Sequence, residues 1–142
     1  MQTLTLSPEQ MESMRLHVED RRPEEACGLL AGKGGHVQQV LPVTNQNHSA
    51  VGFRMDPLEQ LRAFNWMDAN GLDLVAIYHS HPAGPEAASP GNPAPSPTDI
   101  AEAAYPVVYI IWSRADGSWQ AHAYSIQQGR SLEVELSIVR DQ

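Results

Sequence analysis

The chain has 142 residues, the size of one domain and enough to bury a core without disulfides or other staples. Its formal net charge of −8 and its pI near 5.1 argue against nucleic acid or an anionic membrane as the main partner. The single cysteine, Cys27, excludes an internal disulfide, and the longest apolar stretch, Val107 to Trp112, is too short to span a bilayer, so we expect one cytoplasmic domain over residues 1–142.

The first predicted elements are a short strand and a helix. Residues 3–6 alternate in polarity as a strand does. Ser7, with Pro8 at the first helical position and Gln10 at the third, is typical of a helix start, and the helix should continue to about Arg21. Its apolar residues form a broad stripe that we expect to face the core: Met11, Met14, Leu16 and Val18.

The middle of the chain predicts a hairpin, a second helix and a buried strand. A small-residue apolar strand over residues 26–31 and a strand over residues 36–43 flank a glycine-rich turn. After a polar loop over residues 45–52, Asp56 and Pro57 open a helix that ends near residue 71. The apolar residues of this helix recur at helical spacing: Leu58, Leu61, Phe64 and Met67. An apolar run over residues 74–79 then predicts a buried central strand.

The last third begins with a loop over residues 82–95, which is too rich in proline for a helix or strand. Ser96 and Pro97 start a third helix that runs through residue 104. Three strands follow, over residues 107–112, 119–126 and 132–139. This order of elements predicts the α/β class, as an α/β sandwich built on a mixed sheet, with no internal repeat and no second domain.

Two histidines at the end of the central strand are the most informative feature. His79 and His81 are two residues apart, so strand alternation places both imidazoles on one face. Ser80 must point the other way, and we expect it to make a supporting hydrogen bond. A carboxylate from the following helix would add a third ligand of a type that zinc accepts. Three protein ligands leave the fourth position for water, as in a catalytic zinc site.

Two carboxylates need interpretation. Asp99 lies three residues after Ser96, a spacing that also makes a good helix start, and we expect Asp99 to serve both as cap and as metal ligand. Glu25 competes with Glu24 for the role of general base. Alternation places Glu25 on the face of Cys27 and points Glu24 away, so we prefer Glu25. Cys27 itself lies in an apolar strand and is interpreted as a small core residue rather than a nucleophile.

Together these residues resemble the motif of the JAMM/MPN+ metalloprotease family: a distant Glu, then His-x-His-Pro, then Ser-x-x-Asp. Every motif position is filled here, by Glu25, His79, His81, Pro82, Ser96 and Asp99. The family usually places its serine about eight residues after the second histidine, whereas Ser96 follows His81 by fifteen, so we interpret residues 82–95 as a lengthened loop. The resemblance implies the MPN fold, which is similar to that of cytidine deaminases.

The resemblance implies a zinc metallopeptidase or isopeptidase with one Zn²⁺ per chain. His79, His81 and Asp99 would hold the metal, Glu25 would move the proton of the attacking water, and Ser96 would help to stabilise the oxyanion. The family includes enzymes that cut after the Gly-Gly tail of ubiquitin or ubiquitin-like proteins, and small prokaryotic members, which this chain resembles, that trim amino acids from sulfur-carrier proteins with the same tail. The resemblance implies a ubiquitin-like or sulfur-carrier protein as substrate. The alternatives are a general metallopeptidase and a metal-free scaffold domain. A deaminase would need a Pro-Cys-x-x-Cys signature, which this sequence lacks.

Overall fold

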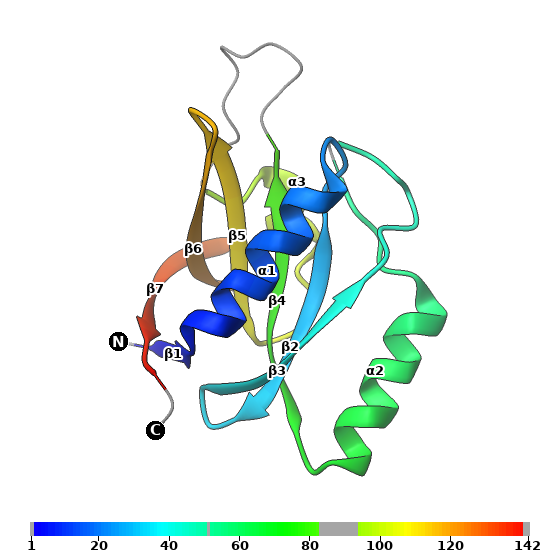
Figure 1. The fold of residues 1–142 in the computed structure, drawn as a ribbon, viewed down its shortest axis with the longest axis vertical. Coiled ribbons are helices and arrows are strands. Elements are labelled where there is room, and N and C mark those ends of the chain that lie inside the picture. Colours follow the sequence, from blue (N-terminus) through cyan, green and yellow to red (C-terminus); the bar gives the residue numbers. More distant parts are fainter. Residues whose placement is uncertain (1, 51, 83–93, 141–142) are drawn as a thin grey trace.

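The computed structural model describes residues 2–50, 52–82 and 94–140, and in this part of the chain strands and helices alternate before a final run of strands (Figure 1). No helix among the described residues is long and apolar enough to cross a membrane. Most of the predicted 82–95 loop lies outside the described residues. The elements are β1 Thr3–Leu6, α1 Pro8–Arg21, β2 Cys27–Lys33, β3 His36–Val43, α2 Pro57–Ala69, β4 Asp73–His81, α3 Pro97–Glu102, β5 Val108–Ala115, β6 Ser118–Gln127 and β7 Arg130–Ile138.

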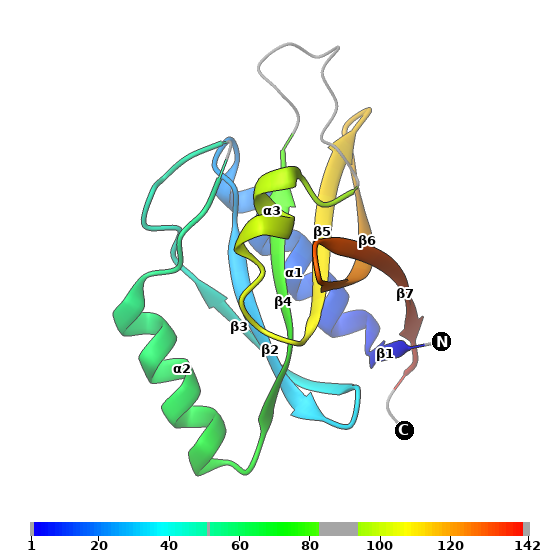
Figure 2. The ribbon, with the colours of Figure 1, turned by 180° about the vertical axis from the view of Figure 1, so that it is seen from behind.

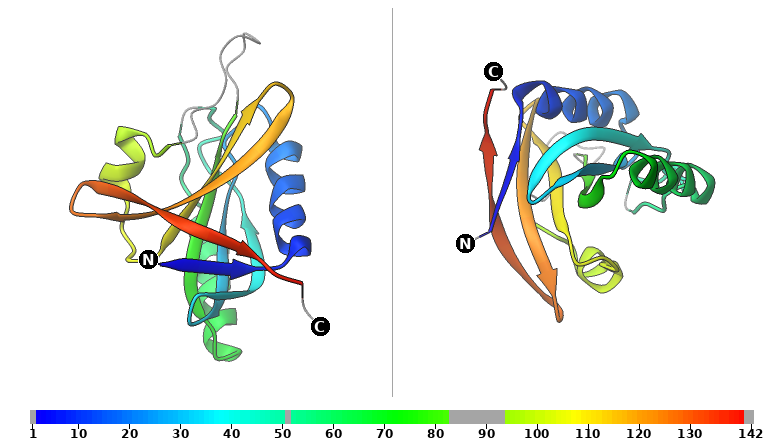
Figure 3. Two further views of the ribbon diagram at one scale, coloured as in Figure 1. Left: turned by 90° about the vertical axis from the view of Figure 1, so that its left-hand side faces the viewer. Right: turned by 90° about the horizontal axis from the view of Figure 1, so that it is seen from below.

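The seven strands form a mixed sheet that closes on itself in the order β1-β3-β2-β4-β5-β6-β7. β4 pairs antiparallel with β2 and parallel with β5. β1 pairs parallel with both β3 and β7, and Figure 3 shows it lying beside β7. The predicted mixed sheet is therefore confirmed. The sheet closes into a barrel because β1 joins the two strands that would otherwise be edges, and the predicted sandwich arrangement is not confirmed.

Strand alternation divides the core between the two faces of the sheet. On one face Met14 and Val18 of α1 pack in a cluster of buried residues that includes even-numbered positions of β4 and β5. On the other face α2 and α3 cover a second cluster, which includes Ile77 of β4. Figures 1 and 2 show α1 on one side of the sheet and α3 on the other. His79 and His81 are two and four residues after Ile77 on β4, so they share its face of the sheet, which α3 covers.

Apolar spacing predicted the helices more accurately than it predicted their buried faces. Leu16 was expected in the core but is 54% exposed, because residues 14 and 18 face inward and residue 16 lies on the opposite side of α1. Leu58 and Leu61 of α2 are exposed as well, and Met67 faces the sheet. The central strand extends two residues further than predicted, so that His81 is still part of β4. The third helix ends at Glu102, two residues earlier than predicted.

A close contact between β2 and the ring of Tyr78 connects the sheet to α1. A methyl group at Gly28 would lie 2.2 Å from the nearest ring carbon of Tyr78, so this position requires glycine. Tyr78 is fully buried, and its hydroxyl shares a 2.7 Å hydrogen bond with Nδ1 of His17 on α1. The site-bearing strand β4 is thereby held from the side that faces away from the histidines.

Candidate active site

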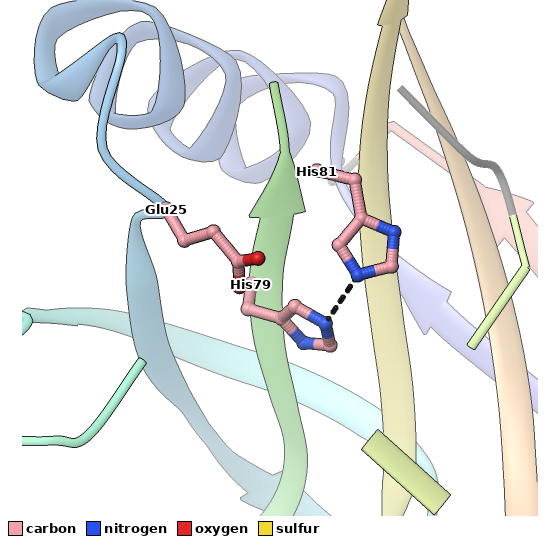
Figure 4. Close-up of side chains that lie close together, drawn as sticks. All are labelled: Glu25, His79 and His81. Atoms are coloured by element: carbon pink, nitrogen blue, oxygen red, sulfur yellow. Dashed lines mark hydrogen bonds between the residues drawn. The ribbon is translucent and has the colours of Figure 1, made fainter. Parts of the chain in front are cut away.

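Two imidazoles and one carboxylate meet at the end of β4. The rings of His79 and His81 point toward each other (Figure 4), and their Nε2 atoms lie 3.1 Å apart. Oδ2 of Asp99 lies 2.9 Å from Nε2 of His81 and 3.2 Å from Nε2 of His79. All three side chains are nearly withdrawn from solvent, with exposed fractions of 10% or less. Three ligand-type atoms thus form a small triangle at the edge of the core.

The pairing of β4 on both sides fixes the histidines. His79 is opposite Cys27 on β2 and opposite Ile111 on β5, so its backbone is held in the middle of the sheet. The ring of Phe53 stacks on the ring of His79, with centroids 4.8 Å apart and planes 27° apart. Ser80 points to the opposite face, as alternation predicts, and its hydroxyl accepts a 2.8 Å hydrogen bond from the backbone N–H of Ala26.

Asp99 is positioned by the first turn of α3. The hydroxyl of Ser96 accepts from the N–H of Asp99 at 3.0 Å, and Oδ2 of Asp99 accepts from the N–H of Ser96 at 2.8 Å. This reciprocal pair is a capping box, so the predicted helix start is confirmed, and the same carboxylate also reaches the histidines. The Ser96 hydroxyl keeps its own proton for a further hydrogen bond.

Glu25 brings a second carboxylate to the histidines from the residues that precede β2 (Figure 4). Its oxygen and one ring nitrogen each of His79 and His81 all lie within 4.8 Å of one another, a group able to hold a metal ion. Oε1 of Glu25 is buried and makes no hydrogen bond to any described residue. The competing Glu24 instead pairs with His48 at 2.8 Å, and its side chain is 30% exposed.

Burial and neighbouring charges give the acidic groups different proton affinities. Burial raises the pKa of Glu25 to about 7. The charge of His81 acts to lower this pKa, and the charge of Asp99 acts to raise it. Burial also acts to raise the pKa of Asp99, but its hydrogen bonds with His79 and His81 prevail and hold that pKa well below its ordinary value. Burial lowers the pKa of His79. At neutral pH the site therefore offers an ionised Asp99 and a neutral His79.

The triangle of donor atoms fits a zinc ion. Tetrahedral zinc with ligand bonds of about 2.0–2.1 Å has ligand atoms about 3.3–3.4 Å apart. The three distances among His79, His81 and Asp99 are 3.1, 2.9 and 3.2 Å, slightly shorter than these edges. Two imidazole nitrogens and one carboxylate oxygen are a ligand set that zinc accepts. The residues present can thus hold zinc with three protein ligands.

A cleft of about 180 Å³ gives access to the donor atoms. It is lined by Phe53, His79, Asp99, Glu102 and Tyr109. The cleft thus reaches two of the three donor residues, His79 and Asp99.

Some residues around the site were outside the sequence-based predictions. Asn45, in the predicted polar loop, is 93% buried and bonds to the backbone of Glu25. Its local bond to the N–H of Asn47 is a turn that asparagine often makes, but its distant bonds have no sequence signal. The prediction for Cys27 is confirmed: it is fully buried, and burial raises its pKa to about 12, which disfavours the reactive thiolate.

Comparison with known proteins identifies the family. The sequence profile of prokaryotic homologues of the JAB domain matches residues 7–126. The chain belongs to this prokaryotic JAB family. The resemblance to JAMM/MPN proteins that the motif predicted is therefore confirmed at the level of the family.

Three relatives of this JAB-family chain have names that describe peptidases. It is 37% identical over 125 residues to a probable TtuB-protein conjugate cleaving protease of Thermus thermophilus, covering 87% of this chain and 76% of the relative. It is 32% identical to a desampylase of Haloferax volcanii, covering 94% of this chain and 96% of the relative. It is 31% identical to a CysO-cysteine peptidase of Mycobacterium bovis, covering 96% of this chain and 91% of the relative.

The fold of this JAB-family chain is similar to that of solved structures. A protein of Desulfitobacterium hafniense superposes with a TM-score of 0.82 at 34% identity, covering 97% of this chain and 94% of that one. A JAB1/MPN domain protein of Archaeoglobus fulgidus superposes with a TM-score of 0.55 at 17% identity, covering 94% and 97%. The second likeness bears on the fold alone.

Proposed function

We propose that this chain is a zinc-dependent peptidase or isopeptidase that hydrolyses the bond after the C-terminal Gly-Gly of a ubiquitin-like or sulfur-carrier protein. The convergence of His79, His81 and Asp99 beside the buried carboxylate of Glu25 is the observation that carries the proposal. The relatives named for TtuB-protein conjugates and for CysO-cysteine support a carrier conjugate as the substrate class.

In this proposal each residue of the site has one task. His79, His81 and Asp99 hold the zinc ion. Zinc bound there supplies Lewis-acid chemistry, which polarises a carbonyl and makes water acidic near neutral pH. Glu25, with its pKa raised to about 7, accepts the proton of the attacking water and returns it to the leaving amine. The hydroxyl of Ser96 accepts from the N–H of Asp99, which leaves its own proton to donate to the oxygen that becomes negative.

A Gly-Gly tail suits the approach to these nearly buried atoms. The cleft beside His79 and Asp99 is about 180 Å³ and has the rings of Phe53 and Tyr109 in its walls. Glycine has no side chain, so its carbonyl can approach a deep site that a bulkier residue cannot reach. A residue with a large side chain in place of the last glycine should therefore block cleavage.

The test is cleavage of defined conjugates by the zinc-loaded protein. The panel is a ubiquitin-like carrier ending in Gly-Gly, joined either to a single amino acid or to a lysine side chain, and the products are identified by mass spectrometry. We expect cleavage after the last glycine and its loss on chelation. Glu25→Gln should bind zinc but lose at least about 100-fold in kcat, whereas Glu24→Gln should keep its activity.

Other outcomes distinguish the rival functions. Cleavage of an unstructured Gly-Gly peptide as fast as the carrier would indicate a general metallopeptidase. Asp99→Ala should lower the zinc content measured by atomic absorption, because it removes one of three ligands. Full zinc content in a His79→Ala/His81→Ala double variant would refute the ligand assignment. A wild-type protein that neither binds zinc nor cleaves any conjugate would instead be a scaffold domain.

A further inference from the structure

We propose that Asn45 is a positioning residue for Glu25: its buried side-chain amide holds the backbone of the base and couples it to the loop that carries Phe53. The inference rests on the proposed role of Glu25 as the general base. Asn45 does not line the cleft beside His79 and Asp99, so it acts through other residues.

The amide of Asn45 uses both of its ends. Nδ2 donates to the backbone oxygen of Glu25 at 2.9 Å, and it also lies 3.1 Å from the oxygen of Gly52 and 3.4 Å from that of Ser49. Oδ1 accepts from the N–H groups of Asn47 and Arg54, both at 3.1 Å. The side chain is thereby bonded to five backbone groups, and only 7% of the residue is exposed.

Glu25 depends on such backbone contacts because one oxygen of its buried carboxylate has no hydrogen-bond partner among the described residues. Oε1 makes no hydrogen bond to a described residue, so the place of the carboxylate follows from the place of the main chain. The N–H of Glu25 donates to the oxygen of Ser49 at 2.7 Å, and its oxygen accepts from Asn45. On the next residue, Ala26 exchanges two hydrogen bonds with Ser80 of β4. The base therefore lies between the loop and β4.

The same amide also holds the backbone on both sides of Phe53. Gly52 accepts from Nδ2 and Arg54 donates to Oδ1, so Asn45 binds the backbone on either side of Phe53. The ring of Phe53 stacks on His79 and lines the cleft. One buried amide thus sets the position of the base and of the aromatic wall relative to each other.

Two substitutions separate the two ends of the amide. Asn45→Asp keeps the acceptor oxygen and removes the donor that reaches Glu25, and Asn45→Ala removes both. With the zinc-loaded protein and a cleavable carrier conjugate, we expect Asn45→Asp to lower kcat by about 10- to 100-fold, because small displacements of a reacting group cost about this much. KM should change less than about 3-fold, and zinc content should be unchanged.

The matched control is Asn70→Ala. Asn70 also uses its Nδ2 to bind a backbone oxygen, that of Trp66 at 2.8 Å, but it does so at the end of α2 and outside the cleft. Its loss should lower the melting temperature and leave kcat unchanged. A general loss of stability is thereby separated from misplacement of the base.

A double-mutant cycle with Glu25→Asp gives the readout that a purely structural role would not change. Glu25→Asp shortens the base and already displaces it, so Asn45→Asp should cost less than about 3-fold in that background. An equal loss in both backgrounds, or a kcat for Asn45→Asp equal to that of the wild type, would overturn the inference and leave the proposed function standing. A wild-type protein that cleaves no conjugate would overturn both.

Discussion

Without metal, Glu25→Gln should make the protein more stable at neutral pH, although the same change should remove activity. Burial raises the pKa of Glu25 from 4.5 to about 7 in the folded protein. A carboxyl whose pKa is higher in the folded state binds protons more tightly there. Its favourable contribution is present below pH 4.5 and is lost as the pH rises toward 7. Glutamine is neutral at every pH and therefore avoids this loss.

The size of the effect follows from the change in pKa. One pKa unit corresponds to about 1.4 kcal/mol, so a rise from 4.5 to about 7 costs the folded protein about 3 kcal/mol once Glu25 is ionised in both states. Most of this cost develops between pH 5 and pH 8. The difference in free energy of unfolding between Glu25→Gln and the wild type should therefore increase by about 2–3 kcal/mol from pH 5 to pH 8, in favour of the variant.

Urea denaturation of the two chelator-treated proteins at pH 5, 6, 7 and 8 measures the effect. All other titrating groups are shared by the two proteins, so only their difference is interpreted. Excess zinc should reduce the difference, because a nearby cation favours the carboxylate. A difference that stays constant from pH 5 to pH 8 would show that Glu25 is not buried as the structure indicates, and the argument for a tuned base would fail with it.

Further predictions concern positions next to the site. Gly28→Ala should lower the free energy of unfolding by about 1–3 kcal/mol, because its methyl group would overlap the ring of Tyr78. Gly52→Ala is the control, because a methyl group there would meet no atom of the described residues within 4 Å, and equal stability losses in urea denaturation would contradict the contact. Cys27→Ala should cost about 1 kcal/mol in packing and keep its activity in the conjugate assay. Loss of cleavage with fold and zinc intact would instead indicate a thiol mechanism.

The parts of the site that the sequence predicted are those that depend on local geometry. Strand alternation sufficed to place His79 and His81 on one face, and Ser80 on the other. The first turn of a helix sufficed to predict the capping role of Ser96 and Asp99. These relations involve residues no more than three apart, where the backbone geometry leaves few alternatives.

The closure of the sheet could not be read from the sequence in the same way. β1 has only four residues, and its partners β3 and β7 are far from it along the chain. Neither pairing has a turn signal, because both are parallel. The exposure of Leu16 was missed for a related reason: helical spacing shows which residues share a face but not how much of that face another element covers.

The site therefore combines three kinds of support. His79 and His81 depend on β4 and its neighbours in the sheet, whereas Glu25 precedes β2 and depends on the loop that Asn45 organises. Asp99 depends on the cap of α3. The sheet holds the backbones of His79 and His81, and the cap of α3 holds Asp99. A change at Asn45 should therefore displace the base more than the donor atoms of the metal site, which the loop reaches through the stacking of Phe53 on His79. Metal binding and proton transfer should then be separable by substitution, and Asn45 is the position where this separation is most direct.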